Sequence, residues 1–580
     1  MNLYKNERIS KCKNQKGGFV LVSIVLLAVI LEGFAAVSLV QQLQDYRMFQ
    51  FNQMKTSSFY AGQGIMERAL AHLADRIANF SVNEIVPNTN YTLNYSDGRT
   101  SGTYMVRCVQ PSGTCASPYQ CPDWQNTPLD QCPAYTITEG GLAKTVQDYE
   151  VIVNSASPDN SAMAQVFPVA ANSKIHQIAS MKQTSIFQYA IFYNSDLEML
   201  PGPNMTISGN IHANGDGYLG SDGNTLTINS ESAHFTGDVH RERKDDGQIP
   251  TGQAVIKKAG TSTYPALSFD SSSATWTPDA TSTWNGSIQS GSHGVQYIQP
   301  VTIPSIQPNG FYYNTAGLRV VDGQAYQRQA NGTYTNITGS LPAGTIVQDQ
   351  FRNNRENSSY DVVVTEIDVN KLRTSGYFPS NGLIYATRTN AVPAQGQTSA
   401  TSHGIRLING SEVRPTGSNG GLTVVTNNPL YVRGDFNTVN KKSVALISDA
   451  FNILSNSWDD ANSNLPLNSR VASNTTINAG MISGIVPTTG SQYSGGLENY
   501  PRFLEKWSSK NMNIAGSFIN LWDSQIGTGQ WIYGGNYYAA PIRNWSYDSS
   551  LQSTPPPFTP VAVEISTKTW WQESKESVYL

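Results

Sequence analysis

The chain has 580 residues, carries a formal net charge of −4 and contains only 14% charged residues. Its length suits two to four domains of about 100–200 residues each. The weak net charge gives no reason to expect a nucleic-acid partner, and the 10% of aromatic residues supply enough apolar material to argue against a disordered chain.

The N-terminal segment is basic and leads into an apolar run. Residues 1–18 contain five cationic side chains against the single acid Glu7. Residues 19–40 are predominantly apolar, interrupted by Glu32 and Gly33, and as a helix they would span roughly 33 Å, enough for a bilayer core. The positive-inside rule places the basic flank in the cytoplasm. We therefore expect one N-terminal membrane helix, with the rest of the chain outside the cytoplasm.

The helical pattern continues well beyond the length that a membrane requires. No proline occurs before Pro87, and apolar residues recur near the helical period at Leu43, Met54, Ile65, Ala69, Leu73 and Ile77. A continuous helix over residues 19–79 would be roughly 90 Å long. A secretory signal peptide would instead place a small-residue cleavage site and a turn after the apolar stretch. The sequence therefore predicts a membrane helix that continues as a stalk, over residues 19–80.

The residues at the start of the apolar run carry a family resemblance. Lys16, Gly17 and Gly18, followed by Phe19 and an apolar helix, resemble the prepilin signal of type IV pilins. In that family a membrane peptidase cuts after the glycine, and the new N-terminus is methylated. The resemblance implies a leader over residues 1–18, cleavage between Gly18 and Phe19, and a methylated Phe19. The apolar helix survives this cut because it later forms the core of a filament.

Within that family the chain resembles the PilX-like minor pilins. Major pilins carry a glutamate at mature position five that pairs with a neighbouring subunit's amine, and Ser23 occupies this position here. PilX-like minor pilins and the K-type pseudopilins of type II secretion also lack it. The stretch FYAGQGIMERAL (59–70) is similar to the PilX-family helix. The resemblance covers residues 16–80 and leaves a type IV pilus and a secretion pseudopilus both open.

Glu32 is an acid inside the apolar segment, where an ionised carboxylate costs about 2.5–3.5 kcal/mol. One interpretation is that Glu32 pairs with an amine or arginine of a neighbouring subunit during assembly. The other is that Glu32 lies near the outer surface of the membrane that the helix spans, and only the apolar residues after it return into the membrane. The sequence leaves both open.

Residues 81–185 change to an alternation of period two, which predicts a small pilin-like sheet domain. Four cysteines lie close together on or beside one of its loops, at Cys108, Cys115, Cys121 and Cys132. In an exported domain they predict two disulfides, with three possible connectivities. A zinc site is the alternative, but the spacings lack the close pairs of cysteine ligands that such sites use.

Residues 186–571 predict a large all-β domain. Short apolar segments alternate there with Gly-Asn-Asp turns, as at residues 205–207, 226–228, 383–388, 422–427, 444–456, 475–484 and 512–522. Short strands without helices favour a parallel β-helix, and a β-sandwich is the alternative. Residues 245–380 are interpreted as an insertion in this domain, 494–507 as its one helical stretch, and 572–580 as a tail. The fold class is therefore α+β overall.

No catalytic or metal-binding motif rises above background in the sequence. The nearest candidates for a metal are His212, His234, His240, Asp216 and Asp238, which meet no ligand-spacing rule. A glycosidase would need a pair of carboxylates at a defined separation. Asp449, Asp459, Asp460 and Glu498 are candidates, but no pattern in the sequence pairs them. We expect no enzyme activity, no catalytic residue, no metal and no cofactor.

The resemblance implies a minor type IV pilin-like subunit that acts in filament assembly or initiation at the tip. Its partners would be other pilin or pseudopilin subunits, the prepilin peptidase and the inner membrane. It would lie in the periplasm, the pilus or the cell surface beyond the membrane. The alternatives are an adhesin that binds surface glycans, with Trp531, Tyr533, Tyr537 and Tyr538 available to stack on sugars, and a membrane-anchored carbohydrate-active enzyme.

Overall fold

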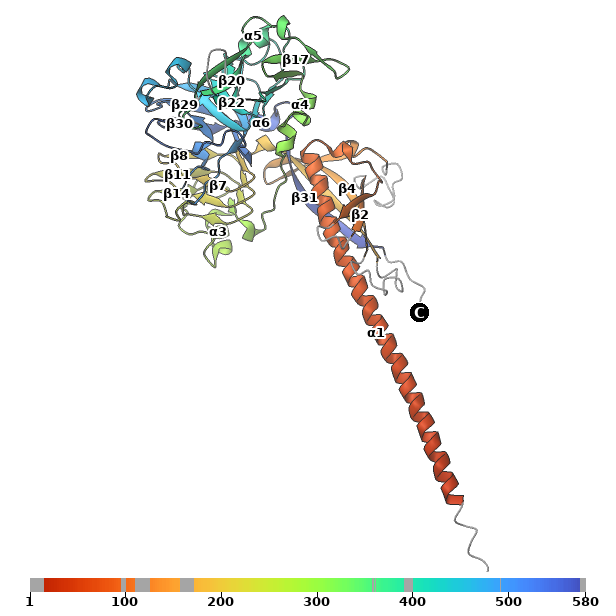
Figure 1. Ribbon diagram of the computed structural model, residues 1–580. Coiled ribbons are helices and arrows are strands. Elements are labelled where there is room, and N and C mark those ends of the chain that lie inside the picture. The colour runs from red at the N-terminus through yellow and green to blue at the C-terminus, as the bar shows by residue number, and fades with distance from the viewer. Residues whose placement is uncertain are drawn as a thin grey trace, which may run out of the picture.

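The computed structural model describes residues 15–94, 101–109, 126–156, 172–356, 359, 361–390, 400–490 and 492–573. A long N-terminal helix carries a β-rich body at one end, and this body contains several separate sheets (Figure 1). The predicted α+β class, with a long helix before a β-rich remainder, is confirmed.

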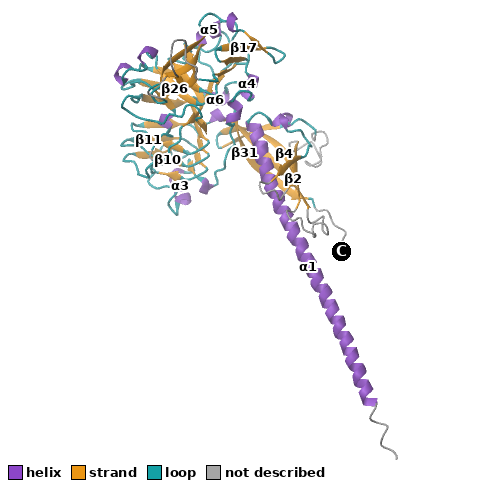
Figure 2. Cartoon of the chain, in the orientation of Figure 1, coloured by secondary structure: helices purple, strands orange, loops and turns teal. Residues whose placement is uncertain are grey.

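The helix α1 runs without interruption from Gln15 to Ala78, which is 64 residues. At 1.5 Å per residue it is about 96 Å long. The continuous helix predicted over residues 19–79 is confirmed. Its N-terminal half extends away from the body, and its C-terminal half lies along the first sheet (Figure 2).

The C-terminal half of α1 packs on one face of that sheet. The buried cluster they share includes Ile65, Ala69, Leu73 and Ile77 from the helix and Tyr104, Val106, Tyr149, Val151, Ile175 and Met181 from the strands. The two surfaces approach closely at two glycines. A Cβ at Gly102 would lie 2.0 Å from the Cδ1 of Ile65, and a Cβ at Gly62 would lie 2.7 Å from the Cδ1 of Ile175. The absence of a side chain at these positions lets helix and sheet meet.

The first sheet is antiparallel and takes its last strand from the end of the chain. Its strands follow the order β1-β2-β4-β5-β31, with β3 also paired to β4. They are β1 (Tyr91–Asn94), β2 (Ser101–Cys108), β3 (Ala134–Glu139), β4 (Leu142–Ala156), β5 (Asn172–Ser185) and β31 (Val561–Gln572). The predicted boundary, with residues 186–571 in one domain and 572–580 in a tail, differs from the structure, because β31 pairs with β5 from Val561 to Gln572. The large region is therefore inserted between two neighbouring strands of the first sheet.

The described residues of the large region form four sheets. The largest has 13 strands: β6 (Ile191–Tyr193), β9 (Ile211–Ala213), β12 (Ala233–Phe235), β15 (Ile288–Gln289), β16 (Leu318–Val321), β17 (Gln324–Arg328), β18 (Tyr334–Asn336), β21 (Leu383–Thr387), β23 (Leu422–Val425), β25 (Val444–Ser448), β27 (Thr475–Ile485), β29 (Asn511–Asp523) and β30 (Ile542–Tyr547). The six-stranded sheet comprises β19 (Ile346–Arg352), β20 (Asp361–Asp368), β22 (Ala400–Ile408), β24 (Pro429–Arg433), β26 (Ala450–Leu454) and β28 (Pro501–Phe503).

Two three-stranded sheets complete the region. One comprises β7 (Leu197–Met199), β10 (Gly217–Leu219) and β13 (Val239–His240), and the other β8 (Met205–Ser208), β11 (Thr225–Asn229) and β14 (Gln253–Ile256). Both sheets are parallel. The chain visits the three sheets of this part in turn, from β6 to β7 to β8, and then returns to β9 beside β6.

Apolar side chains stack in register from one such passage to the next. In the 13-stranded sheet Ile191 lies beside Ile211, Ile211 beside Ala233, and Ala233 beside Ile288, all in parallel pairs. These residues are 1% exposed or less. Apolar residues buried at the same place in successive strands build a continuous core, because each short strand covers the apolar side chains of its neighbour.

The residues predicted to be an insertion contribute strands to these sheets. Segments β14, β15, β16, β19 and β20 all lie within residues 245–380 and pair with strands outside that range or with each other. The part of the large region that the structure describes also contains the short helices α3 (Trp276–Trp284), α4 (Phe311–Thr315), α5 (Val369–Thr374) and α6 (Ser550–Ser553).

The helix predicted at residues 494–507 was wrong. The structure has a short 3-10 turn at Leu497–Asn499 and then the strand β28, in which Pro501 lies beside Phe451. A proline suits this end position because it is the first residue of its strand and donates no hydrogen bond to the ladder. Pairing with β26 overrides the apolar spacing that looked helical.

Candidate functional site

The N-terminal half of α1 presents an apolar surface that no described residue of the body covers. Between Val22 and Ala78, one 18-residue window has a mean hydropathy of 2.4 and contains no buried residue. Its large side chains are at least half exposed at most positions, for example Val22 at 64% and Phe34 at 71%. By length and composition this stretch meets the requirement for a membrane span.

The residues named for processing and assembly all lie on this half. The backbone at Gly18 and Phe19 is helical, because α1 begins before them at Gln15. Ser23 and Glu32 are exposed on the helix surface. A Cβ at the neighbouring Gly33 would meet no atom within 4 Å. The helix therefore offers Ser23 and Glu32 to whatever surrounds it.

The other end of α1 closes in a motif that usually requires glycine. The N–H of Ser81 donates to the carbonyl of Arg76 at 2.8 Å, and the N–H of Phe80 donates to the carbonyl of Ile77 at 3.2 Å. This is the Schellman pattern, in which the residue after the cap is left-handed. Phe80 holds that position with a φ of 58°. A phenylalanine is disfavoured there, so a contact elsewhere must compensate.

That contact is with the large region. The ring of Phe80 stacks on the ring of Phe311, with centroids 4.1 Å apart and planes 10° apart. Asn79, one residue earlier, accepts three hydrogen bonds on its Oδ1, from the N–H of Thr302 at 2.8 Å, the hydroxyl of Thr302 at 2.9 Å and the hydroxyl of Ser305 at 2.8 Å. The end of the helix is therefore a docking point for the segment around residues 302–311.

The chain connections reinforce this joint between the helix end and the large region. The strand β31 and Gln299 exchange two backbone hydrogen bonds of 2.8 Å through Val563, and the N–H of Ile186 donates to the carbonyl of Pro560 at 3.1 Å. A shared buried cluster joins Leu142 and Ala562 of the first sheet to side chains of the large region. With two chain crossings side by side and a common core, the two parts form one continuous unit.

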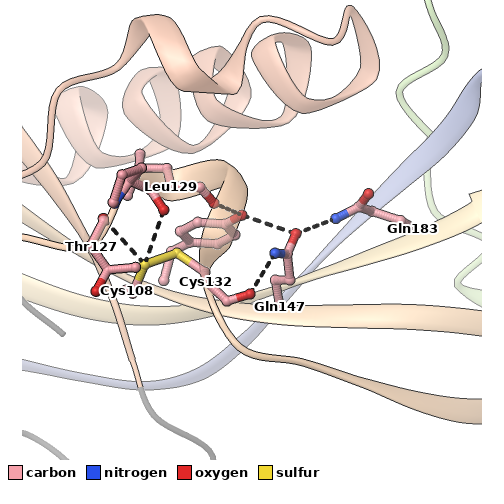
Figure 3. Close-up of a disulfide and its surroundings, with 8 residues drawn as sticks. Cys108, Thr127, Leu129, Cys132, Gln147 and Gln183 are labelled. Carbon is pink, nitrogen blue, oxygen red and sulfur yellow. Dashed lines mark hydrogen bonds between the residues drawn. A yellow bond between two sulfur atoms is a disulfide. The ribbon is translucent and has the colours of Figure 1, made fainter.

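A disulfide closes a loop at one end of the first sheet. Cys108 on β2 is bonded to Cys132, with their Cα atoms 5.4 Å apart (Figure 3). The hydroxyl of Tyr149 donates to the carbonyl of Leu129 at 3.2 Å, and the amide of Gln147 donates to the carbonyl of Cys132 at 2.9 Å. The loop is thus fastened both covalently and by hydrogen bonds. Cys115 and Cys121 lie outside the described residues, so the predicted second bond stays a prediction.

The sheet face opposite α1 carries a buried ionic network. Glu150, 2% exposed, accepts from Nδ1 of His176 at 2.8 Å and pairs with Arg107 at 2.5 Å. Burial acts to raise the pKa of Glu150, but the hydrogen bonds from His176 and Arg107 outweigh it and hold this pKa below its usual value. His176 also contacts Glu573 at 2.9 Å, just beyond β31. The network therefore fastens the C-terminal strand to the centre of the sheet.

The candidate histidines lie on two different sheets. His212 and His234 are register neighbours on β9 and β12, and Nε2 of His212 lies 3.0 Å from Oδ1 of Asn214. His240 on β13 stacks on Tyr218 and lies 3.7 Å from Asp216. Burial lowers the pKa of both His212 and His234 to about 4. Among the described residues no three such side chains gather as metal ligands.

The four carboxylates weighed as catalytic candidates each have a structural contact. Asp449 accepts three backbone N–H groups from residues 525–527. Asp460 pairs with the fully buried Arg406 at 2.7 Å, and Asp459 accepts from the N–H of Ala461 at 3.0 Å. Glu498 accepts from the hydroxyl of Tyr493. Each of the four acids therefore has a hydrogen-bond or ion-pair partner within the fold.

Sequence reasoning missed the docking residues Asn79 and Phe80. The available signal was the absence of glycine where the helix ends, since a Schellman motif without glycine indicates a constraint from elsewhere. The partner Phe311 is far away in the sequence and could not be read from it.

Comparisons with known proteins give little further. No protein-family model matches the chain, and no curated protein matches it. Among solved structures, the competence-associated pilin ComZ from Thermus thermophilus is similar to 90% of this chain and 98% of its own, at 9% identity and a TM-score of 0.25. A superposition this loose carries no argument about fold or role.

Proposed function

We propose that this chain is a minor type IV pilin-like subunit, anchored by α1 and displaying the large β-rich region outside the cytoplasm. The observation that carries the proposal is the division of α1 into two halves. One half exposes an apolar surface long enough for a membrane, and the other is buried against an antiparallel sheet. A secretory signal peptide does not require a helix that continues and packs on a folded domain. A filament subunit requires both the apolar half of the helix and the half that packs on its own sheet.

The N-terminal residues support processing by a prepilin peptidase. The leader ends in Gly17-Gly18, and the apolar helix follows at once. Cleavage between Gly18 and Phe19 would remove the basic segment and leave the helix intact, and methylation would follow on Phe19. N-terminal mass spectrometry of the protein from its native membrane tests this directly. A mature chain that begins at Met1, or beyond residue 40, would contradict it.

A substitution sharpens that test. Gly18→Val is expected to leave unprocessed chain in the membrane, because the cleavage site is lost while the helix is preserved. Gly33→Val serves as the matched control, since a Cβ there meets no atom within 4 Å and the position lies away from the cleavage site. Equal processing of both variants would contradict the assignment of the site.

The position of the subunit is proposed to be the filament tip or the membrane-bound initiation complex. The large region is rigidly docked at the end of α1, so neighbouring copies along a shaft would have to accommodate it at every position. Ser23 supplies no charge for the amine of a preceding subunit, and Glu32 is the acid within the apolar stretch that would pair with a neighbour. Gold labelling of an epitope tag on isolated filaments tests this. Label spread evenly along the shaft would contradict it.

The large region is proposed to be a parallel β-helix. The supporting observations are its short parallel strands, the return of the chain to the same three sheets in turn, and the in-register apolar stacks such as Ile191 beside Ile211. A β-sandwich would be built from antiparallel sheets. An experimental structure of the body would test the proposal by whether the sheets wind around one common core.

A further inference from the structure

One loop of the large region presents aromatic rings to solvent on an unusually well-fastened backbone. Residues 524–542 contain no charged side chain and include Trp531, Tyr533, Tyr537 and Tyr538. Tyr533 is 58% exposed and its neighbour Ile532 is 39% exposed, whereas Tyr538 is buried. The sequence analysis named these aromatics as residues available to stack on sugars, and the exposure of Tyr533 suits that role better than a place in the core.

Buried charges hold the first part of this loop. Asp449, 2% exposed, accepts the N–H groups of Gln525 at 2.5 Å, Ile526 at 3.0 Å and Gly527 at 2.7 Å. Three successive N–H groups on one carboxylate fix the direction of the chain. Burying a carboxylate is unfavourable unless it accepts such hydrogen bonds. The loop backbone therefore stabilises the buried Asp449, and Asp449 in turn holds the loop backbone in place.

An ion pair holds the next turn. The carboxylate of Glu356 accepts the N–H of Gly529 at 2.8 Å and pairs with Arg502, and both side chains are less than a tenth exposed. The carbonyl of Gly529 accepts from Arg502 at 2.6 Å and from Arg355 at 3.0 Å. A Cβ at position 529 would lie 2.1 Å from the carbonyl oxygen of Arg355, so only glycine fits there. Buried charged side chains therefore bind both the N–H and the carbonyl group of Gly529 and hold this part of the loop in place.

Trp531 is fixed at both its backbone and its ring. Its N–H donates to the hydroxyl of Ser494 at 3.1 Å, its carbonyl accepts from Gln492 at 2.9 Å, and its indole Nε1 donates to the hydroxyl of Tyr538 at 2.7 Å. The ring of Tyr533 lies 6.1 Å from that of Trp531 at an interplanar angle of 20°. The two nearly parallel rings form a rigid pair whose outer member is exposed.

We propose that Trp531 and Tyr533 form a binding platform for a neutral saccharide. The C–H face of a pyranose ring of the saccharide stacks on the ring of Tyr533. This goes beyond the role of a filament subunit. The loop is uncharged, so it suits a neutral ligand, and the exposed amide of Gln530 is able to hydrogen-bond hydroxyl groups. Asn536 is also exposed, but its Oδ1 already accepts from the N–H of Leu467 at 2.8 Å, which leaves its amide nitrogen as the donor.

The exposed large apolar side chains of the loop are Ile532, Tyr533 and, at its end, Ile542, which is a small area for a stable protein interface. A ring pair that is already rigid loses little conformational entropy on binding.

Retention on insoluble polysaccharides tests the platform. The full chain is reconstituted in lipid nanodiscs, because detergents with sugar headgroups would compete, and is applied to chitin, cellulose and the acidic polysaccharide alginate. We expect retention on at least one of the two neutral polymers, and release by soluble oligosaccharides of the same sugar. No retention on either neutral polymer, or salt-sensitive retention on alginate alone, would overturn the proposal.

Substitutions locate the contact. Tyr533→Ala removes an exposed ring and is expected to weaken retention by about tenfold or more, as for aromatic residues that dominate an interface. Tyr297→Ala is the matched control, since that tyrosine is 51% exposed on another part of the body. Trp531→Ala is read together with its thermal denaturation, because that ring is partly buried. Equal binding by wild type and Tyr533→Ala would overturn the proposal, and neither result bears on cleavage at Gly18.

Discussion

The rings of Phe80 and Phe311 stack with their centroids 4.1 Å apart, and Phe80 adopts a left-handed φ of 58° to do so. One residue thus ends the stalk helix and docks the large region onto it. Because the left-handed conformation costs a phenylalanine roughly 1 kcal/mol, the stack must return at least that much. The orientation of the body relative to the helix axis depends on this contact and on Asn79.

We expect Phe311→Ala to destabilise the joint by about 1–2 kcal/mol, since it removes the stack and leaves Phe80 strained. Differential scanning calorimetry should then resolve a separate transition for the large region. Phe80→Gly should cost less than Phe80→Ala, because glycine alone relieves the left-handed strain. Equal stabilities of these two variants would argue against strain at this position.

Removal of the C-terminal strand should unfold the first sheet rather than the large region. Deletion of residues 561–580 takes away β31, which pairs with β5 along 11 positions and contributes to the shared cluster through Ala562. We expect rapid proteolysis within β4 and β5, with the large region more resistant. Deletion of residues 574–580 is the control, because it retains β31. A first sheet that stays protease-resistant without β31 would contradict this.

The disulfide between Cys108 and Cys132 should be found by non-reducing peptide mapping of the exported protein. Replacing both cysteines by serine is expected to lower the free energy of unfolding by about 2–4 kcal/mol, because the open loop gains entropy in the unfolded chain. Cys115 and Cys121 are expected to pair with each other. Recovery of Cys108 linked to either of these two, or of stoichiometric zinc, would contradict the prediction.

Glu198 should make the stability of the large region fall between pH 4.5 and pH 7. Burial raises its pKa from 4.5 to about 7, while a hydrogen bond from Thr488 acts in the opposite direction. The native state then keeps a proton that the unfolded chain has released, so stability is greatest below pH 4.5 and falls by up to about 3 kcal/mol as pH rises to 7. Glu198→Gln should flatten this part of the curve of urea midpoint against pH. An unchanged slope would contradict it.

His212 should act with the opposite sign. Burial lowers its pKa from 6.5 to about 4, and its hydrogen bond with Asn214 acts the other way. The unfolded chain binds a proton below pH 6.5 that the native state refuses, so stability falls as pH drops from 6.5 towards 4. His212→Gln should reduce the loss on the acid side, measured by the same urea midpoints. His240→Gln, on the other sheet, serves as the control.

The sequence by itself determined the features that depend on local order. The long helix α1 follows from an uninterrupted apolar period without proline, and several strands of the large region, such as β8, β11 and β23, follow from apolar segments between turn residues. The disulfide-bearing loop follows from clustered cysteines. Each of these signals lies within a few neighbouring residues, where side-chain periodicity and turn chemistry act directly on the backbone.

Only the tertiary structure decided how these elements combine. The strand β31 joins the first sheet because β5 offers an edge, although the whole large region lies between them in the chain. Residues 501–503 became a strand because β26 lies beside them. Cys108 bonded to Cys132, and Phe80 found Phe311, through proximity that folding creates. Backbone pairing and ring stacking between distant residues leave no local periodicity in a single sequence, so no pattern along the chain could have predicted them.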